Sequence, residues 1–166
     1  VANRLRVEVE EIIGLFVNTL VLRTDIPDNP RWIELLDRVR KEVLGAQTHQ
    51  DLPFEHLVDA LQPERNLSHS PLFQVMFTLQ TPAEQSMETP GLRVDNMEID
   101  PGTALFDLSL DMVVEPDRLS GSFEYNTDLF DESTVKRYAD GLLKILASMV
   151  AKPEGRLYDT PSVTDR

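Results

Sequence analysis

Histidine is the side chain best suited to acid–base chemistry at neutral pH, and this 166-residue sequence contains three: His49, His56 and His69. They stand singly, and no serine in a sharp strand-to-helix turn accompanies them as a nucleophile. His56 falls in a segment with helical periodicity, where we expect it at the surface or packed against neighbours. The absence of cysteine excludes disulfides and thiolate metal sites. The residue types alone therefore define no complete active site.

Three polar residues nevertheless stand at positions with a physical meaning. Asp51 lies two residues before Pro53, where it is well placed to cap or favour the N-terminus of a helix. Asn18 lies in an otherwise apolar segment, and because an unpaired buried amide costs about 1–3 kcal/mol we expect it to be hydrogen-bonded. His49 falls near the end of a predicted helix, where a cation interacts favourably with the helix dipole.

The elements that must position these residues follow from hydrophobic spacing. Residues 13–24 are rich in aliphatic and β-branched types, which predicts a buried strand. Asn29 and Pro30 are typical of a cap followed by a helix start. Apolar residues at helical spacing then predict a helix from Pro30 to Gln47. A second, short helix is predicted to begin at Pro53.

Beyond Pro63 the hydrophobic period changes to two, which predicts strands. Alternating apolar residues run from Phe73 to Leu79 and from Phe106 to Val114. Residues 115–118, with proline at the second position, predict a turn into a third strand that ends at Tyr125. Asp131 is predicted to cap a last helix, and the sequence after Pro153 is typical of a linker. This order predicts an α+β fold with a mixed or antiparallel sheet flanked by helices.

Charge and hydropathy exclude two classes of partner. The formal net charge of −13 comes without any basic stripe, which argues against nucleic-acid binding. The longest apolar stretch, residues 12–22, is shorter than the roughly 20 residues of a membrane helix and is interrupted by Gly14 and Asn18. We therefore expect no membrane segment. The lack of cysteine agrees with a cytoplasmic location.

Several segments resemble the core motifs of the condensation domains of non-ribosomal peptide synthetases, in the order in which that family has them. The resemblance covers roughly residues 1–153, and residues 154–166 are expected to form an interdomain linker. The matching segments are Ile13-Gly14-Leu15-Phe16-Val17-Asn18-Thr19, His49-Gln50-Asp51-Leu52-Pro53-Phe54-Glu55, Arg65-Asn66-Leu67-Ser68-His69-Ser70-Pro71-Leu72-Phe73 and Glu124-Tyr125-Asn126-Thr127-Asp128-Leu129-Phe130. Phe16-Val17-Asn18-Thr19 favours a peptide-bond-forming member over epimerisation or heterocyclisation relatives.

The resemblance implies a place in a larger fold. Condensation domains are similar to two chloramphenicol-acetyltransferase-like lobes, and this chain resembles part of the C-terminal lobe. The expected partners are the N-terminal lobe, the donor and acceptor peptidyl carrier proteins and an adjacent adenylation domain. No covalently bound cofactor is expected, only the phosphopantetheine arms of the carrier proteins.

The family's catalytic motif, His-His-x-x-x-Asp-Gly, is absent from this chain. The resemblance implies that the motif belongs to a region before these residues, and that no catalytic residue lies in this chain. What remains would form a wall of the substrate tunnel, with Asp51, Asn18 and His49 as candidate tunnel residues. By itself the chain is expected to be inactive.

Two other interpretations stay open. The chain could be a non-catalytic, condensation-like module that docks carrier proteins or a tailoring enzyme, since the catalytic motif is absent. It could also be related to carnitine- or polyketide-type acyltransferases, which share the fold class. The match at Val17-Asn18-Thr19 and Phe54-Glu55 argues against this last interpretation.

Overall fold

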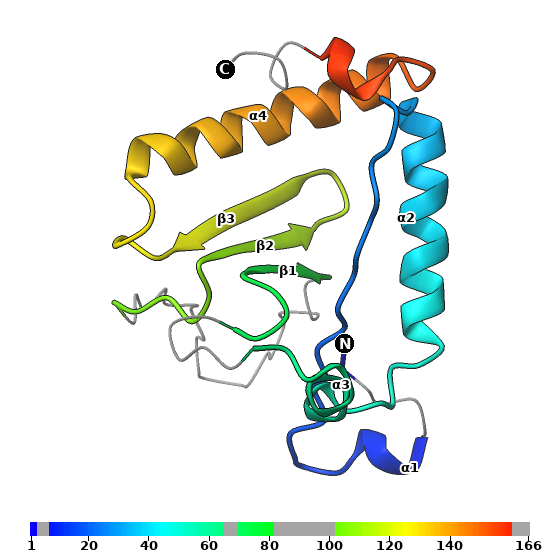
Figure 1. Ribbon diagram of the computed structural model, residues 1–166, viewed down its shortest axis with the longest axis vertical. Coiled ribbons are helices and arrows are strands. Elements are labelled where there is room, and N and C mark those ends of the chain that lie inside the picture. Colours follow the sequence, from blue (N-terminus) through cyan, green and yellow to red (C-terminus); the bar gives the residue numbers. More distant parts are fainter. Residues whose placement is uncertain (3–6, 65–69, 82–101, 161–166) are drawn as a thin grey trace, which may run out of the picture. The chain divides into compact units, whose positions relative to one another are not determined.

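The computed structural model describes residues 1–2, 7–64, 70–81 and 102–160 (Figure 1). The chain divides into two compact units, one of residues 1–65 with 140–166 and one of residues 66–139. In chain order the described elements are α1 (Val7–Glu10), α2 (Trp32–Gln47), α3 (Phe54–Leu61), β1 (Val75–Gln80), β2 (Leu108–Val114), β3 (Leu119–Tyr125), α4 (Glu132–Ala151) and the 3-10 helix η1 (Leu157–Asp159). None of the described helices is long and apolar enough to cross a membrane.

Helices α2 and α3 confirm the two helices predicted for the first unit, with a later start for α2. The helix begins at Trp32 with Arg31 at the N-cap position, so Asn29 is not its cap. Both Asp28 and Asn29 have positive φ angles, 57° and 47°, and this left-handed turn separates Asn29 from the helix. The local sequence therefore indicated the helix correctly and its cap wrongly.

The prediction of a buried strand over residues 13–24 is wrong for the described structure. This segment is extended, but no strand is assigned to it. The side chains of Ile13, Leu15 and Val17 are 102%, 91% and 68% exposed. A strand needs a neighbour. Between described residues, Asn18 and Val1 exchange two hydrogen bonds, at 3.0 and 2.8 Å.

The second unit contains a three-stranded mixed sheet in the order β1-β2-β3, which Figure 1 shows with β2 in the middle. Strand β1 is parallel to β2, with Val75 beside Leu108, and β2 is antiparallel to β3. The hairpin closes through the backbone N–H of Glu115, which donates to the carbonyl of Arg118 at 2.9 Å. The α+β fold with a mixed sheet is confirmed.

One face of this sheet is apolar, and the part of it on β1 is exposed. On β1, the side chains of Val75, Phe77 and Leu79 are 60%, 56% and 57% exposed, and the register places them beside the apolar residues of β2. On β2 the most buried side chain is Ser109, on the opposite face, at 7% exposed. The alternation predicted the strands correctly. The apolar face that it marks is more than half exposed on β1, whereas Leu108, Leu110 and Met112 of β2 are partly buried.

The buried side chains of the first unit gather around the start of α2. Trp32 is 2% exposed, Leu157 9% and Thr160 3%. Two of these three residues belong to 154–160, a segment that the sequence assigns to a linker but that packs against α2 in the structure. The remaining linker residues, 161–166, lie outside the described part of the chain. The domain boundary at residue 153 stays a prediction.

Candidate functional site

A pocket of about 340 Å³ lies in the first unit, where two of the motif segments meet. One wall comes from the extended segment 15–19 and the other from the loop and first turn that lead into α3. The lining residues are Leu15, Phe16, Val17, Asn18, Thr19, Asp51, Pro53, Phe54 and Glu55. The two motifs are therefore adjacent in space although about 30 residues separate them in the sequence.

Asn18 holds the two walls of the pocket together. Its Nδ2 donates to the backbone carbonyls of Gln50 and Leu52, both at 2.7 Å. Its Oδ1 accepts from the backbone N–H of Thr19 at 3.0 Å and from that of Phe54 at 3.2 Å. Two donated and two accepted bonds use the hydrogen-bonding capacity of an amide side chain. The expectation that Asn18 is hydrogen-bonded is confirmed.

The bond to Phe54 also contributes to the N-terminus of α3. Pro53 occupies the N-cap position and makes no side-chain cap hydrogen bond. The N–H of Phe54 is the first of the helix, one of the groups that find no acceptor within the helix itself, and the side chain of Asn18 supplies one. The alternative that Asp51 caps α3 is therefore wrong: the cap position is Pro53, and the cap-like acceptor is Asn18.

Asp51 instead lines the pocket with an exposed carboxylate. Among the described residues it has no hydrogen-bond or ion-pair partner, so its oxygens are available to accept hydrogen bonds from a ligand. Glu55 adds a second exposed carboxylate, and Leu15 and Val17 supply apolar surface. A lining of this kind can accept hydrogen bonds at one end of a ligand and contact aliphatic groups at the other.

His49 lies apart from the pocket lining, just after α2. Its Nδ1 is 3.0 Å from the carbonyl of Gly45 in the last turn of the helix and 2.9 Å from Oγ1 of Thr48. The predicted position at the C-terminal end of the helix is confirmed, and this contact with a terminal carbonyl suits a ring N–H donor. The structure thus brings Asn18 and Asp51 together and leaves His49 outside.

His56 adds no catalytic group to the pocket. His56 is exposed on α3, as expected, and His69 lies outside the described residues together with most of its motif. In the described part of the chain no group of three or more histidine, cysteine, aspartate or glutamate residues could hold a metal ion. Sequence reasoning did not select Glu55 or Phe54 for the pocket, although both stand in the same motif as Asp51.

Comparison with known proteins places these motifs in a family. The family profile of the condensation domain matches residues 1–166. A linear gramicidin synthase from Brevibacillus parabrevis is 50% identical over 159 residues, which are 95% of this chain and 2% of that protein. Malpinin synthetase from Mortierella alpina is 45% identical over 153 residues, 92% of this chain and 2% of that protein. The chain therefore spans only a small part of the curated relatives that it matches.

Two solved structures share the fold. The chain is similar to a four-domain non-ribosomal peptide synthetase, holo-AB3403, with a TM-score of 0.86 and 26% identity, over 96% of this chain and 13% of that one. It is also similar to the X-domain in the complex of the X-domain and OxyB from teicoplanin biosynthesis, with a TM-score of 0.81 and 27% identity, over 96% of this chain and 36% of that one. The chain belongs to the condensation domain family of non-ribosomal peptide synthetases.

Proposed function

We propose that this chain is the C-terminal part of a condensation domain that forms peptide bonds between carrier-bound substrates. In this reaction the amine of the acceptor attacks the donor thioester carbonyl. The new C–N bond forms, the C–S bond breaks, the donor arm leaves as a thiol, and the amine loses a proton. The observation that best supports this proposal is the pocket in which two condensation motifs meet through Asn18.

The role of the chain in that reaction is positional. The motif His-His-x-x-x-Asp-Gly is absent from the sequence, and we assign the task of base for the attacking amine to such a motif outside the chain. The pocket would instead contribute a wall of the tunnel in which the two phosphopantetheine arms meet. Holding two reactants in a productive geometry can account for about 7–11 kcal/mol of a barrier, so such a wall can matter without donating a proton.

Exposed apolar surface supports the view that the chain is one part of a larger fold. The apolar face of β1 and the extended segment 13–17 expose large side chains that water solvates poorly. The chain also matches only 36% of the X-domain chain with a TM-score of 0.81, so the remaining part of such a domain is available to cover them. We propose the N-terminal lobe as that cover.

The remaining partners follow from the same proposal. Donor and acceptor carrier proteins would deliver their phosphopantetheine arms to the tunnel, and an adenylation domain would adjoin the chain. A cytoplasmic location is part of the proposal and rests on the lack of cysteine.

Reconstitution tests the proposal. The chain is combined with the missing N-terminal region, as a fusion or a second chain, and mixed with loaded donor and acceptor carrier proteins. Mass spectrometry of the acceptor carrier protein should then detect the condensation product, and this chain alone should give none. Product from this chain alone, or none from the reconstituted domain, would contradict the proposal.

A pair of variants tests the pocket in the same assay. Asp51→Ala removes an unpartnered carboxylate from the pocket lining, whereas His56→Ala removes an exposed side chain from the same helix region outside it. Asp51→Ala should lower the rate of product formation more than His56→Ala. Equal effects of the two substitutions would remove Asp51 from the site and leave the assignment of the family intact.

A second candidate function is a non-catalytic docking module. It is favoured by the similarity to the X-domain from the complex with OxyB, a structure in which a related domain binds another protein. This function predicts that the reconstituted domain binds a partner protein and forms no amide. An intact histidine motif in the missing region, together with product formation, would decide against it.

A further inference from the structure

Residues 153–160, here called the strap, follow α4 and complete the N-terminus of α2. The first two helical N–H groups of α2 belong to Trp32 and Ile33. They donate to the strap carbonyls of Gly155 and Pro153 at 2.9 and 3.1 Å. The groups that a helix leaves unpaired at its start are thus satisfied by chain about 120 residues away.

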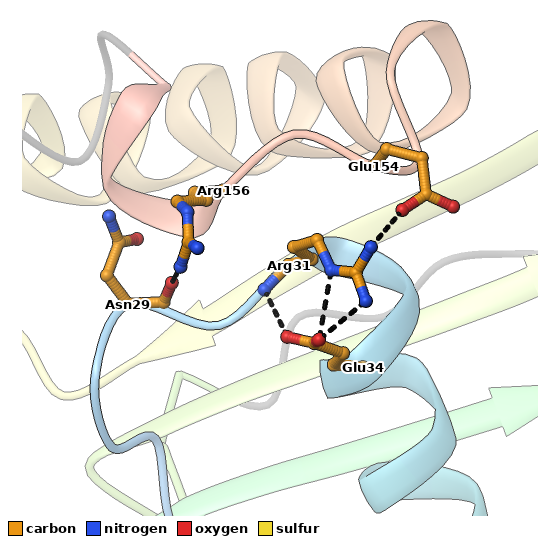
Figure 2. Close-up of polar contacts among 5 residues, drawn as sticks. All are labelled: Asn29, Arg31, Glu34, Glu154 and Arg156. Carbon is orange, nitrogen blue, oxygen red and sulfur yellow. Dashed lines mark hydrogen bonds and ion pairs between the residues drawn. The ribbon is translucent and has the colours of Figure 1, made fainter.

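The local sequence supplies only part of the cap. The Glu34 side chain accepts from the backbone N–H of Arg31 at 3.0 Å, and the N–H groups of Trp32 and Ile33 are paired by the strap. Arg31 stands at the N-cap position without a side-chain cap hydrogen bond, and a guanidinium has no acceptor atom. Its side chain instead binds carboxylates on both sides, as Figure 2 shows: Glu34 of the helix at 2.8 Å and Glu154 of the strap at 2.6 Å. Arg31 therefore links the first turn of α2 to the strap.

Asn29 fixes the strap at a second point. Its carbonyl accepts from Nη1 of Arg156 at 2.8 Å (Figure 2), and its Oδ1 accepts from the backbone N–H of Tyr158 at 2.8 Å. Asn29 has a positive φ of 47°, a conformation that costs energy for a residue other than glycine and persists only where surrounding contacts hold it. The strap provides two such contacts.

Close packing against the start of α2 also holds the strap. The N–H of Leu157 donates to the carbonyl of Pro30 at 3.1 Å, and the Leu157 side chain is buried. A Cβ atom at Gly155 would stand 3.0 Å from the Lys152 carbonyl, so an alanine there requires that carbonyl to shift, whereas Cδ1 of Trp32 at 3.8 Å is at ordinary van der Waals distance. Further along, the hydroxyls of Thr160 and Ser148 are 3.2 Å apart.

We propose that the strap is an anchor built into this unit, which fixes the position from which the chain continues beyond Thr160. If an interdomain linker started at residue 154, the position of Thr160 relative to α2 would not be fixed. With the strap bound, the following chain starts from a defined point beside Trp32. Release of its eight residues would lengthen the tether by roughly 25–30 Å at full extension. The strap would thereby set how far the next segment can move.

Trypsin cleavage in the full chain measures whether the strap is bound. The bond after Arg156 is the tryptic site within the strap, because Lys152 precedes a proline. In the bound strap the N–H of Leu157 and its side chain are engaged, so the bond should be cut much more slowly than in a free peptide of residues 152–166. Intact-mass spectrometry follows the loss of residues 157–166.

Two glycine substitutions give a matched comparison. Gly155→Ala places a methyl 3.0 Å from the Lys152 carbonyl, so the strap backbone should shift and cleavage after Arg156 should accelerate by roughly tenfold. Gly45→Ala, in α2 with nothing within 4 Å of the added methyl, should leave the cleavage rate unchanged. Trp32 is the single tryptophan, so its fluorescence should shift to the red in Gly155→Ala and not in Gly45→Ala.

If Gly155→Ala does not fold, Asn29→Ala is used in its place. This substitution removes the acceptor for the Tyr158 N–H and leaves Gly155 unchanged. It too should accelerate cleavage after Arg156, with far-UV circular dichroism unchanged. Cleavage of the unmodified chain at the peptide's rate would overturn the proposal. Equal rates of cleavage after Arg156 in the unmodified chain, Gly155→Ala and Asn29→Ala would also overturn it.

Discussion

The Oδ1 atom of Asn18 accepts a hydrogen bond from the backbone N–H of Phe54 at 3.2 Å, across 36 residues of sequence. The same side chain holds the carbonyls of Gln50 and Leu52. One amide therefore fixes both the start of α3 and the loop that carries Asp51. Because its hydrogen-bonding capacity is used within the protein, we expect Asn18 to position the pocket.

Replacing Asn18 should lower the free energy of unfolding. Asn18→Ala takes the amide partner away from two carbonyls and from the N–H of Phe54, and such groups cost about 1–3 kcal/mol when they stay unpaired and shielded from water. The matched control is Asn126→Ala, which removes a local bond from the N–H of Asp128 to Oδ1 of Asn126. Urea unfolding should show a larger loss for Asn18→Ala. Equal losses of unfolding free energy in the two variants would mean that the long-range hydrogen bonds of Asn18 add nothing to stability.

Acid should weaken the first unit through Glu34. Hydrogen bonds from the backbone N–H and side chain of Arg31 lower the pKa of the Glu34 carboxyl below its ordinary value of 4.5. A carboxyl with a lowered folded-state pKa contributes stability above its unfolded pKa and loses it as the pH falls through the folded value. The urea midpoint should therefore fall between about pH 5 and pH 3, and less steeply in Glu34→Gln.

Asp37→Asn is the control for this measurement. Asp37 lies on the same helix and has no ion pair among the described residues. Its replacement should leave the pH dependence of the urea midpoint close to that of the unmodified chain. A flattening equal to that of Glu34→Gln would show that the charge of the helix, and not the pair with Arg31, sets the acid sensitivity.

Two glycines should respond to alanine with opposite signs. Gly141 lies inside α4 with nothing within 4 Å of an added methyl, so Gly141→Ala should stabilise by about 0.5–1 kcal/mol. In Gly121→Ala on β3 the new methyl would meet the Asp111 carbonyl at 3.1 Å and Cγ of Met112 at 3.2 Å. That variant should be destabilised. The melting temperatures of the two variants are compared with that of the unmodified chain. A higher melting temperature for Gly121→Ala would show that the sheet accommodates the methyl group without destabilisation.

The isolated chain should self-associate through the apolar face of its sheet. Phe77 on edge strand β1 is 56% exposed on the same face as Val75 and Leu79, and such edges favour association. Phe77→Ser should reduce the concentration-dependent mass in sedimentation velocity. Thr78→Ser, on the opposite face of β1, should not. A clean monomer of the unmodified chain at all concentrations would contradict this prediction.

The sequence was informative wherever structure depends on near neighbours. Period 3.6 predicted α2 and α3, and period 2 with a proline turn predicted the β2–β3 hairpin. The requirement that a buried amide be paired pointed to Asn18. Short-range patterns failed where the partner is remote. The acceptors for the first helical N–H groups of α2 and α3 are Gly155 and Asn18 instead of Asn29 and Asp51, and nothing in the local sequence indicates those contacts.

The predicted strand over residues 13–24 failed for a related reason. Its aliphatic composition indicates burial, but burial needs a partner surface that the described residues do not supply. The strap shows the opposite case, in which residues typical of a linker make defined contacts with the first unit. Its Gly, Pro and Asp residues are typical of a linker, yet backbone carbonyls that any residue carries make its main contacts.

The parallel pairing of β1 with β2 has a consequence for the order of folding. Val114 pairs with Leu119 across a four-residue turn, whereas Val75 pairs with Leu108 across the 32 residues from 76 to 107. Closing the longer loop costs about 2 kcal/mol more chain entropy, so the hairpin should form first. Strand β1 leaves the ribosome before β2 and β3, but it can pair only after both have been made. Hydrogen exchange should find its amides the first of the sheet to open.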